Sequence, residues 1–164
     1  MQAPKRKSEQ YAAVPVDYHI TQEKFNALAA KLARLRHSRP ALAAEVGRLG
    51  AMGDFSENAP YQIAKGRLRS VNDRIEETEN LLKKAVIIKQ KTGGEAALGS
   101  TVVVSAAGEE KTYQILGSQE TKPERGIISR NSPIGSALLG KKAGERVVVK
   151  IGTREIEYKI LEIK

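Results

Sequence analysis

The sequence predicts an α+β protein in which an antiparallel coiled-coil hairpin of two long helices precedes a small, mainly antiparallel β domain with one short helix. Two heptad patterns of apolar residues fill the first half of the chain, with a glycine-containing segment between them. Beyond Gly94, apolar residues alternate with polar ones, as they do in strands. Aromatic residues are only 4% of the chain, so we expect packing through aliphatic side chains rather than a thick β-sandwich.

Composition restricts the possible functions. The 164 residues include no cysteine, so disulfides, zinc–thiolate sites and cysteine nucleophiles are excluded. Apolar runs stay well short of the roughly 20 residues that cross a bilayer, and the basic N-terminus is not followed by the apolar segment of a secretory signal. We therefore expect a cytoplasmic protein without a membrane partner. The net charge of +9 favours a polyanionic partner.

Changes of pattern divide the chain into units. Residues 1–18 should form a flexible basic tail, because Pro4 and Pro15 oppose regular structure and a basic cluster lies between them. The other predicted units are a coiled-coil hairpin over 19–90 with an acidic tip at 53–58, a linker over 91–98, and the β domain over 99–164.

The first helix is expected to begin after Thr21, which can cap it, with Glu23 in the first turn. Apolar residues then recur with alternating steps of three and four, which predicts a heptad seam broken only at Arg39. Pro40 should kink the helix or interrupt it briefly. The seam consists of Phe25, Leu28, Leu32, Leu35, Leu42, Val46 and Leu49.

A second seam with the same spacing follows the glycine-containing segment. It consists of Tyr61, Ala64, Leu68, Val71, Ile75, Thr78, Leu82 and Ala85. Two heptad helices joined by a short turn form an antiparallel hairpin, and an arm of roughly 30 residues is about 45 Å long. Because two helices alone have no further layer to cover them, the hairpin should project as a rod with the turn at its tip.

The second half predicts a β domain. Its helix should have Ser132 as the N-cap, Pro133 in the first turn and Gly140 in the left-handed position after its end. Candidate strands cover 101–104, 112–116, 126–129, 146–151 and 155–163, with glycine-containing turns at 107–108 and 152–153.

Asp54 and Glu57 are the only acids between Glu45 and Asp73, and they lie three residues apart at the tip. The spacing by itself favours a capping box, in which Asp54 and Glu57 satisfy free amides at the start of the second helix. Alternatively, both carboxylates could bind one divalent cation. Two carboxylates cannot complete the octahedral oxygen shell of Mg²⁺, so this second role requires a partner that already holds the metal and a phosphodiester.

Two segments closely resemble signatures of the Gre family, which includes GreA and GreB. The first is Gly53-Asp54-Phe55-Ser56-Glu57-Asn58-Ala59-x-Tyr61 at the tip. The second is Asn131-Ser132-Pro133-Ile134-Gly135-Ser136-Ala137-Leu138-Leu139-Gly140-Lys141 in the β domain. The start Ile20-Thr21-x-Glu23 is also similar, and the resemblance runs in register over about residues 19–164. One departure is Gly135-Ser136, where the family commonly has Ala-Arg.

The resemblance implies that the C-terminal domain has an FKBP-like fold and docks on bacterial RNA polymerase, at the rim of its secondary channel. Docking would involve Ser132, Pro133, Ile134, Leu138 and Leu139. The hairpin would enter the channel, where Asp54 and Glu57 would help to hold a Mg²⁺ of the polymerase. The polymerase would then cleave the 3′ end of backtracked RNA, so the chain would be an activating factor, not an enzyme, with no cofactor of its own.

The resemblance also suggests roles for other hairpin residues. Phe55, Ser56, Asn58 and Tyr61 would shape the tip or touch the nascent RNA. Basic residues around Arg67 and Arg69 look more like GreB than GreA. In the GreB subfamily, such a patch contacts extruded RNA. The candidate basic patch comprises Arg34, Arg36, Arg39, Arg48, Lys65, Arg67, Arg69 and Arg74. A solvated basic face is the alternative interpretation of these eight residues. We expect a monomer.

Three other function classes could use parts of this sequence. A channel-inserting inhibitor of RNA polymerase could use the same architecture, although the intact acidic tip argues against it. A general nucleic-acid-binding coiled coil would act through charge alone and would not need Asp54 or Glu57. A prolyl isomerase needs an aromatic-lined pocket, but residues 91–164 contain only Tyr113 and Tyr158 as aromatics.

Overall fold

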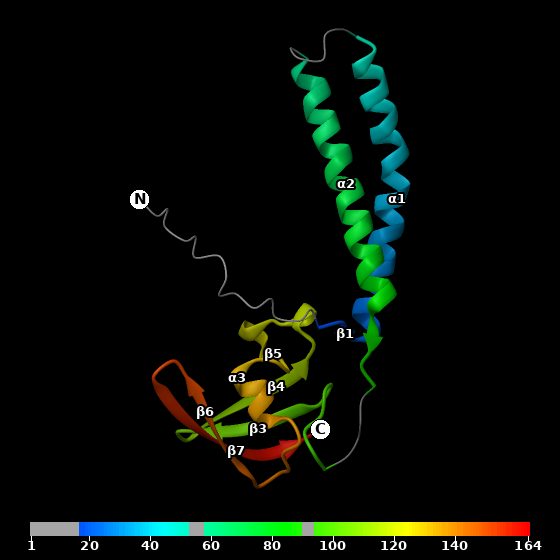
Figure 1. Cartoon of the computed structure of the whole chain (residues 1–164). Coiled ribbons are helices and arrows are strands. Elements are labelled where there is room, and N and C mark those ends of the chain that lie inside the picture. The colour runs from blue at the N-terminus through cyan, green and yellow to red at the C-terminus, as the bar shows by residue number, and fades with distance from the viewer. Residues whose placement is uncertain (1–16, 53–57, 90–93) are drawn as a thin grey trace, which may run out of the picture.

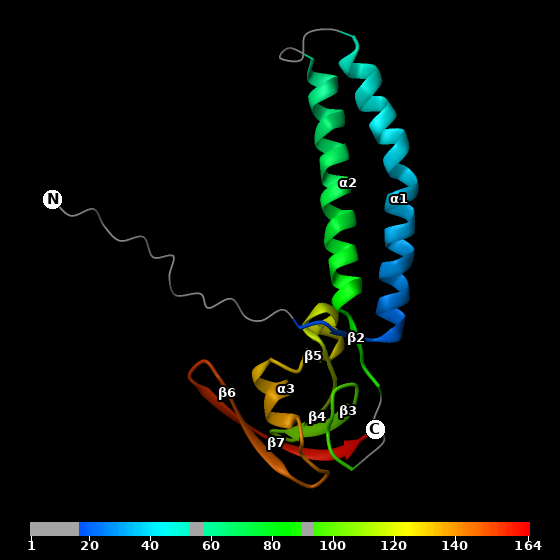
Figure 2. The ribbon, with the colours of Figure 1, turned by 45° about the vertical axis from the view of Figure 1, so that its right-hand side comes forward.

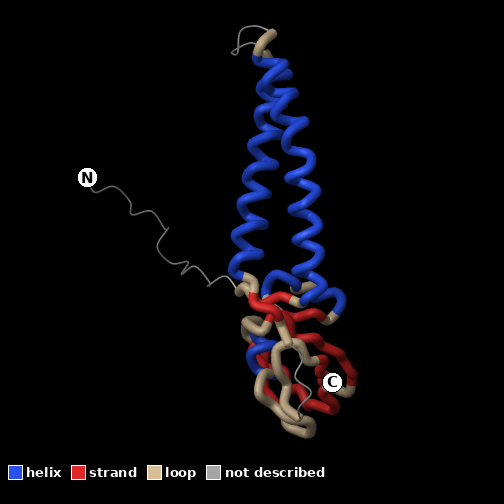
Figure 3. The backbone as a smooth tube through the Cα atoms, turned by 90° about the vertical axis from the view of Figure 1, so that its right-hand side faces the viewer, coloured by secondary structure: helices blue, strands red, loops and turns tan. Residues whose placement is uncertain are grey.

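Two long antiparallel helices form a projecting hairpin, and a curled β-sheet domain lies at its root (Figure 1). The computed structural model describes residues 17–52, 58–89 and 94–164. Helix α1 is Gln22–Gly50 and helix α2 is Ala59–Lys84. The tube in Figure 3 shows the two helices side by side along their length. The predicted fold class, a helical hairpin followed by a β domain with one short helix, is confirmed.

The facing surfaces of α1 and α2 are made from the two predicted seams. Leu32, Ala64 and Thr78 are buried between the helices, and the other apolar seam residues are half-buried. Arg39, which breaks the first seam, is exposed, and its Nε donates a hydrogen bond of 2.8 Å to Asn72 Oδ1 on the other helix. The polar interruption is thus used as a bond between the helices.

Pro40 lies within α1, and the helix continues through it without a break. The expectation of an interruption was wrong, and Figure 2 shows α1 gently bowed instead. Proline removes one amide donor and bends a helix without ending it when the surrounding residues pack well. The seam residues on either side of Pro40, Leu35 and Leu42, both pack towards α2, which holds the helix together here.

A feature that the sequence did not predict joins the start of α1 to the end of α2 at the root of the hairpin. Strand β1 (His19–Ile20) precedes α1, strand β2 (Val86–Ile87) follows α2, and they pair in parallel. The amide of Val86 donates to the carbonyl of Tyr18, and that of Ile88 to the carbonyl of Ile20, each at 2.9 Å. Both arms therefore leave a common, hydrogen-bonded root.

The β domain has one five-stranded sheet with the order β5-β4-β3-β7-β6. Neighbouring strands are antiparallel except for β4 and β5, which are parallel. The strands are β3 (Thr101–Ala106), β4 (Glu109–Leu116), β5 (Ile127–Ser129), β6 (Arg146–Ile151) and β7 (Arg154–Ile163). Two short 3₁₀ helices, η1 (Ser118–Glu120) and η2 (Pro123–Arg125), connect β4 to β5.

Helix α3 (Pro133–Leu138) covers one face of this curled sheet (Figure 2). Its fully buried Leu138 belongs to the same core cluster as Val102, Ile115 and Ile160 of β3, β4 and β7. Ala96, which was predicted to belong to the linker, is 2% exposed and is part of the same core. No helix in the described part of the chain is long and apolar enough to cross a membrane.

Candidate functional site

The described residues include the two helix ends that flank the predicted acidic tip. Asp54, Phe55, Ser56 and Glu57 lie outside the described residues. Helix α1 ends at Gly50 immediately before them, and α2 begins at Ala59 immediately after. The end of α1 and the start of α2, which flank the tip sequence, lie at the end of the hairpin that is farthest from the β domain (Figure 1).

Asn58 connects the two arms at this end. Its side-chain Oδ1 accepts a hydrogen bond of 3.0 Å from the amide of Tyr61, which makes Asn58 the N-cap of α2. Its Nδ2 donates a 2.9 Å hydrogen bond to the carbonyl of Leu49, in the last turn of α1. The N-cap of α2 is therefore Asn58 and not Asp54, as a capping box of Asp54 and Glu57 would require; these two acids lie outside the described residues.

The first turn of α2 supports this cap. Pro60 lies at its second position, where the missing amide has no partner in the helix. Tyr61 is half-buried against the seam, and the Lys65 ammonium lies 5.8 Å from the centre of its ring, a cation–π contact. Met52, at the other end of the turn, is 69% exposed. The tip therefore presents an apolar side chain to solvent beside the acidic segment.

The eight predicted basic-patch residues are all exposed on α1 and α2. Two of them bridge the helices: Arg39 to Asn72, as above, and Arg36, whose Nη2 lies 2.9 Å from Glu79 Oε1. Arg67 and Arg69 form no side-chain bond with any described residue. The patch thus contains some residues that stabilise the hairpin and others that are available to a ligand.

The predicted docking residues have different environments. Ser132 caps α3, accepting from the amide of Gly135 at 3.0 Å and donating to the carbonyl of Ser129 at 2.7 Å. Pro133 is exposed, whereas Ile134 and Leu139 are half-buried against the core. Leu138 is 0% exposed, so the prediction that it contacts a docking partner directly was wrong. Its apolar side chain belongs to the core because it lies on the inner face of α3.

A close contact with the backbone explains why position 135 in the Gly135-Ser136 pair is a glycine. A Cβ built on Gly135 would lie 2.1 Å from the carbonyl oxygen of Ser129. Alanine at this position would require α3 or β5 to move. The close approach of α3 to the end of β5 therefore favours glycine at position 135.

Sequence reasoning missed a group of polar residues at the hairpin root. Asp17 was expected in a flexible tail, but it is buried, and its Oδ1 accepts a 3.1 Å hydrogen bond from the amide of His19. His19 Nδ1 lies 2.7 Å from the same oxygen, and Arg130 Nε lies 3.5 Å from Oδ2. Burial raises the pKa of the Asp17 carboxyl, but the bonds from His19 and the charge of Arg130 outweigh it and hold this pKa below its usual range.

A second missed contact lies beside this group. The carboxylate of Glu120 accepts two hydrogen bonds of 2.6 Å from Thr21, one from its amide and one from its hydroxyl. Ninety-nine residues separate Thr21 from Glu120, so no local pattern could have indicated the pair. As predicted, Thr21 is also the N-cap of α1, and its Oγ1 accepts from the amide of Lys24.

The described residues offer no group of three or more His, Cys, Asp or Glu side chains arranged to hold a metal ion. The predicted shared Mg²⁺ concerns Asp54 and Glu57, which lie outside those residues. By number of donors, these two carboxylates suit a metal whose remaining ligands come from elsewhere.

Comparisons with known proteins agree with the predicted resemblance. Residues 18–87 match the family described as "Transcription elongation factor, N-terminal", and residues 90–164 match "Transcription elongation factor, GreA/GreB, C-term". Transcription elongation factor GreA of Thermomicrobium roseum is 39% identical over 149 residues, covering 88% of this chain and 96% of the relative. GreA of Bacillus cytotoxicus is 38% identical over 153 residues, covering 90% and 96%. Among solved structures, GreA factor homolog 1 of Thermus thermophilus aligns at 25% identity with a TM-score of 0.41, covering 89% of this chain and 97% of that one.

Proposed function

Since the chain belongs to the GreA/GreB family of transcription elongation factors, we propose that it stimulates RNA polymerase to cleave the 3′ end of backtracked RNA. In this proposal the β domain docks on the polymerase and the hairpin carries Asp54 and Glu57 into the secondary channel. The observation that carries the proposal is the frame around the tip, in which Asn58 caps α2 and ties it to α1. The N-cap position of α2 thus belongs to Asn58 and not to either of the two acids.

The dimensions of the hairpin support this use. Helix α1 has 29 residues, which at 1.5 Å per residue gives a rod about 44 Å long. The cross-helix bonds of Arg36 and Arg39 lie along the middle of the rod. A long, narrow and internally bonded hairpin can present a few side chains at the end of a channel while the β domain stays outside.

The distribution of charge also supports it. Exposed arginines on the arms favour entry into a cavity lined by nucleic acid, and the tip sequence supplies the only two acids between Glu45 and Asp73. Mg²⁺ commonly takes one or two protein carboxylates together with phosphate and water oxygens. Asp54 and Glu57 would be such ligands, completing a site that the polymerase and its RNA provide. Such a metal ion stabilises negative charge and lowers the pKa of bound water.

Further parts of the proposal concern partners and catalysis. The chain would act as a monomer in the cytoplasm. RNA polymerase would be the catalyst, and the RNA 3′ end would be the second partner that the chain contacts. Pro133, with the partly exposed Ser132, Ile134 and Leu139, would form part of the docking surface. Arg67 and Arg69 would contact extruded RNA.

A stalled, backtracked elongation complex with 3′-labelled RNA tests the proposal. We expect the wild-type chain to release short 3′ fragments rapidly at fixed Mg²⁺ and salt. Asp54→Ala and Glu57→Ala should each abolish this release while binding to the polymerase persists. Binding without any stimulation by the wild type would contradict the proposal and favour a channel inhibitor. Equal activity of the wild type and both variants would favour binding through charge alone.

A further inference from the structure

The hairpin root is attached to the β domain through a specific carboxylate. Both oxygens of Glu120, at the end of η1, accept 2.6 Å hydrogen bonds from Thr21, the residue that begins α1. Hydrogen bonds to a carboxylate are stronger than neutral ones, and two of them fix orientation as well as distance. The negative charge also lies at the N-terminal end of a 29-residue helix, where it is favoured.

The attachment acts on both arms together. Thr21 directly follows β1, whose pairing with β2 joins the start of α1 to the end of α2. Gly117, next to η1, approaches so closely that an added Cβ would lie 1.9 Å from the carbonyl oxygen of His19. Among the described elements, β1 and η1 form the principal contact between the hairpin root and the β domain. Glu120 therefore holds the whole hairpin, not one helix.

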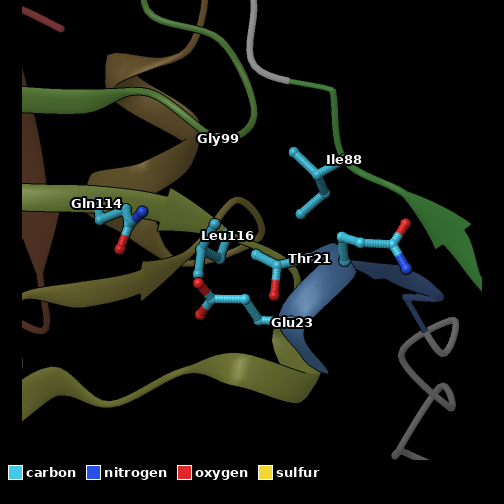
Figure 4. Close-up of a pocket in the computed structure, with 7 residues that line it drawn as sticks. Thr21, Glu23, Ile88, Gly99, Gln114 and Leu116 are labelled. Carbon is cyan, nitrogen blue, oxygen red and sulfur yellow. The ribbon is translucent and has the colours of Figure 1, made fainter. Parts of the chain in front are cut away.

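An open pocket of about 400 Å³ is lined in part by Thr21. Figure 4 shows Thr21 and Glu23, at the start of α1, on one side of it and Gln114 and Leu116 of β4 on the other. Because no side chains fill this space, packing there does not oppose a rotation of the root. The angle of the hairpin thus depends on a few contacts, namely those around Glu120 and the ion pair of Asp17 with Arg130.

The length of the hairpin amplifies any change at the root. For a rod of about 44 Å, a rotation of roughly 10° moves the tip by about 8 Å. Misplacing a reacting group by about 1 Å can reduce a rate by roughly 100-fold. We propose that Glu120 is a positioning residue for transcript cleavage: by binding Thr21, it sets the angle at which the hairpin leaves the docking domain. This inference rests on the proposed function.

The first test measures the angle in the free protein. The chain has no cysteine, so spin labels can be placed uniquely on α2 with Ser70→Cys and on β4 with Glu110→Cys, both exposed. We expect a narrow distribution of distances for the labelled parent and a broad one after Glu120→Ala. Thr21→Ser keeps both donors and should retain the narrow distribution. Glu124→Gln, on the neighbouring η2, removes the same charge from an exposed position and should also retain it.

The second test separates positioning from docking. In the cleavage assay, Glu120→Ala should lower the maximal rate about tenfold and leave the half-saturating concentration of factor within twofold. Glu120→Gln, which keeps one acceptor oxygen, should have an intermediate rate, and Glu124→Gln should match the wild type. Circular dichroism should show the same helix content in all variants.

Three results for Glu120→Ala would overturn the inference. The first is an unchanged distance distribution, and the second is a broad distribution with an unchanged maximal rate of cleavage. The third is a loss of activity that appears only as a higher half-saturating concentration of factor. If the wild type itself stimulates no cleavage, the proposed function fails. In that case the positioning role for cleavage fails with it, and the distance measurement still reports whether Glu120 fixes the hairpin.

Discussion

The side-chain amide of Asn58 donates a 2.9 Å hydrogen bond to the carbonyl of Leu49, across the turn that separates the two helices. The same side chain caps α2 through the amide of Tyr61. One residue therefore binds a carbonyl at the end of α1, which also accepts from the amide of Met52 at 3.3 Å, and an amide at the start of α2. Asn58 therefore ties together the two helix ends that flank residues 53–57 in the sequence.

Asn58→Asp should separate the two roles of this residue. The carboxylate can still cap α2, but it cannot donate to Leu49 and would repel that carbonyl. We expect a loss of about 1 kcal/mol in the free energy of unfolding and a lower maximal rate of cleavage, because the tip is held less firmly. Urea unfolding and the cleavage assay provide the measurements. If Asn58→Asp equals the wild type in both, the bond to Leu49 has no role in the tip.

The exposed arginines of α2 give a prediction about salt. Replacing Arg67 and Arg69 by alanine should reduce the slope of log affinity against log salt by about 1.4 for a backtracked complex with long extruded RNA, since each phosphate contact to a single strand contributes about 0.7. The matched control is the double variant Arg154→Ala and Lys159→Ala on β7, which removes the same charge from exposed positions. Equal slopes for the two double variants would indicate a solvated basic face.

Asp17 predicts a dependence of stability on pH. Its pKa is lower in the folded protein than the value of about 3.9 in an unfolded chain, so the carboxylate stabilises the fold fully above that value. This stabilisation is lost as the pH falls through the folded pKa. Asp17→Asn should therefore cost about 1–2 kcal/mol at pH 7 and progressively less below pH 4. Urea unfolding at several pH values tests this, and a difference that is independent of pH would contradict it.

Two glycines predict opposite effects of the same substitution. Gly117→Ala places a methyl group against the carbonyl of His19, and we expect a loss of about 1–3 kcal/mol as the root shifts. Gly66 lies inside α2 with nothing within 4 Å of an added Cβ, so Gly66→Ala should stabilise the protein by about 0.5–1 kcal/mol. Thermal unfolding measures both. Similar melting temperatures for the two variants would show that the contact between His19 and Gly117 is unimportant.

Local patterns predicted most of the fold. The heptad spacing identified both helices and their inner faces, and strand 146–151 was predicted with the bounds that the structure has. The parallel pair of β1 and β2 was not predicted, because strands of two residues carry no periodicity. At Pro40 the sequence left a kink and a brief interruption open, and it could not decide between them because the continuity of α1 depends on packing against α2 and not on proline itself.

The candidate site was predictable only in part. The composition of the tip drew attention to Asp54 and Glu57, but their spacing favoured a capping box, a role that the structure gives to Asn58. The contacts of Glu120 with Thr21 and of Asp17 with Arg130 join residues about a hundred positions apart. Such pairs arise from the tertiary fold, so a single sequence does not reveal them.

The most direct test of the tip acids is the cleavage activity of Asp54→Asn. Asparagine caps helices as well as aspartate does but lacks the negative charge that binds Mg²⁺. On a backtracked complex, we predict that Asp54→Asn binds the polymerase like the wild type and loses nearly all stimulation of cleavage, with partial recovery as Mg²⁺ is raised. Full activity of Asp54→Asn at all Mg²⁺ concentrations would contradict the proposal that this carboxylate acts on a metal of the polymerase.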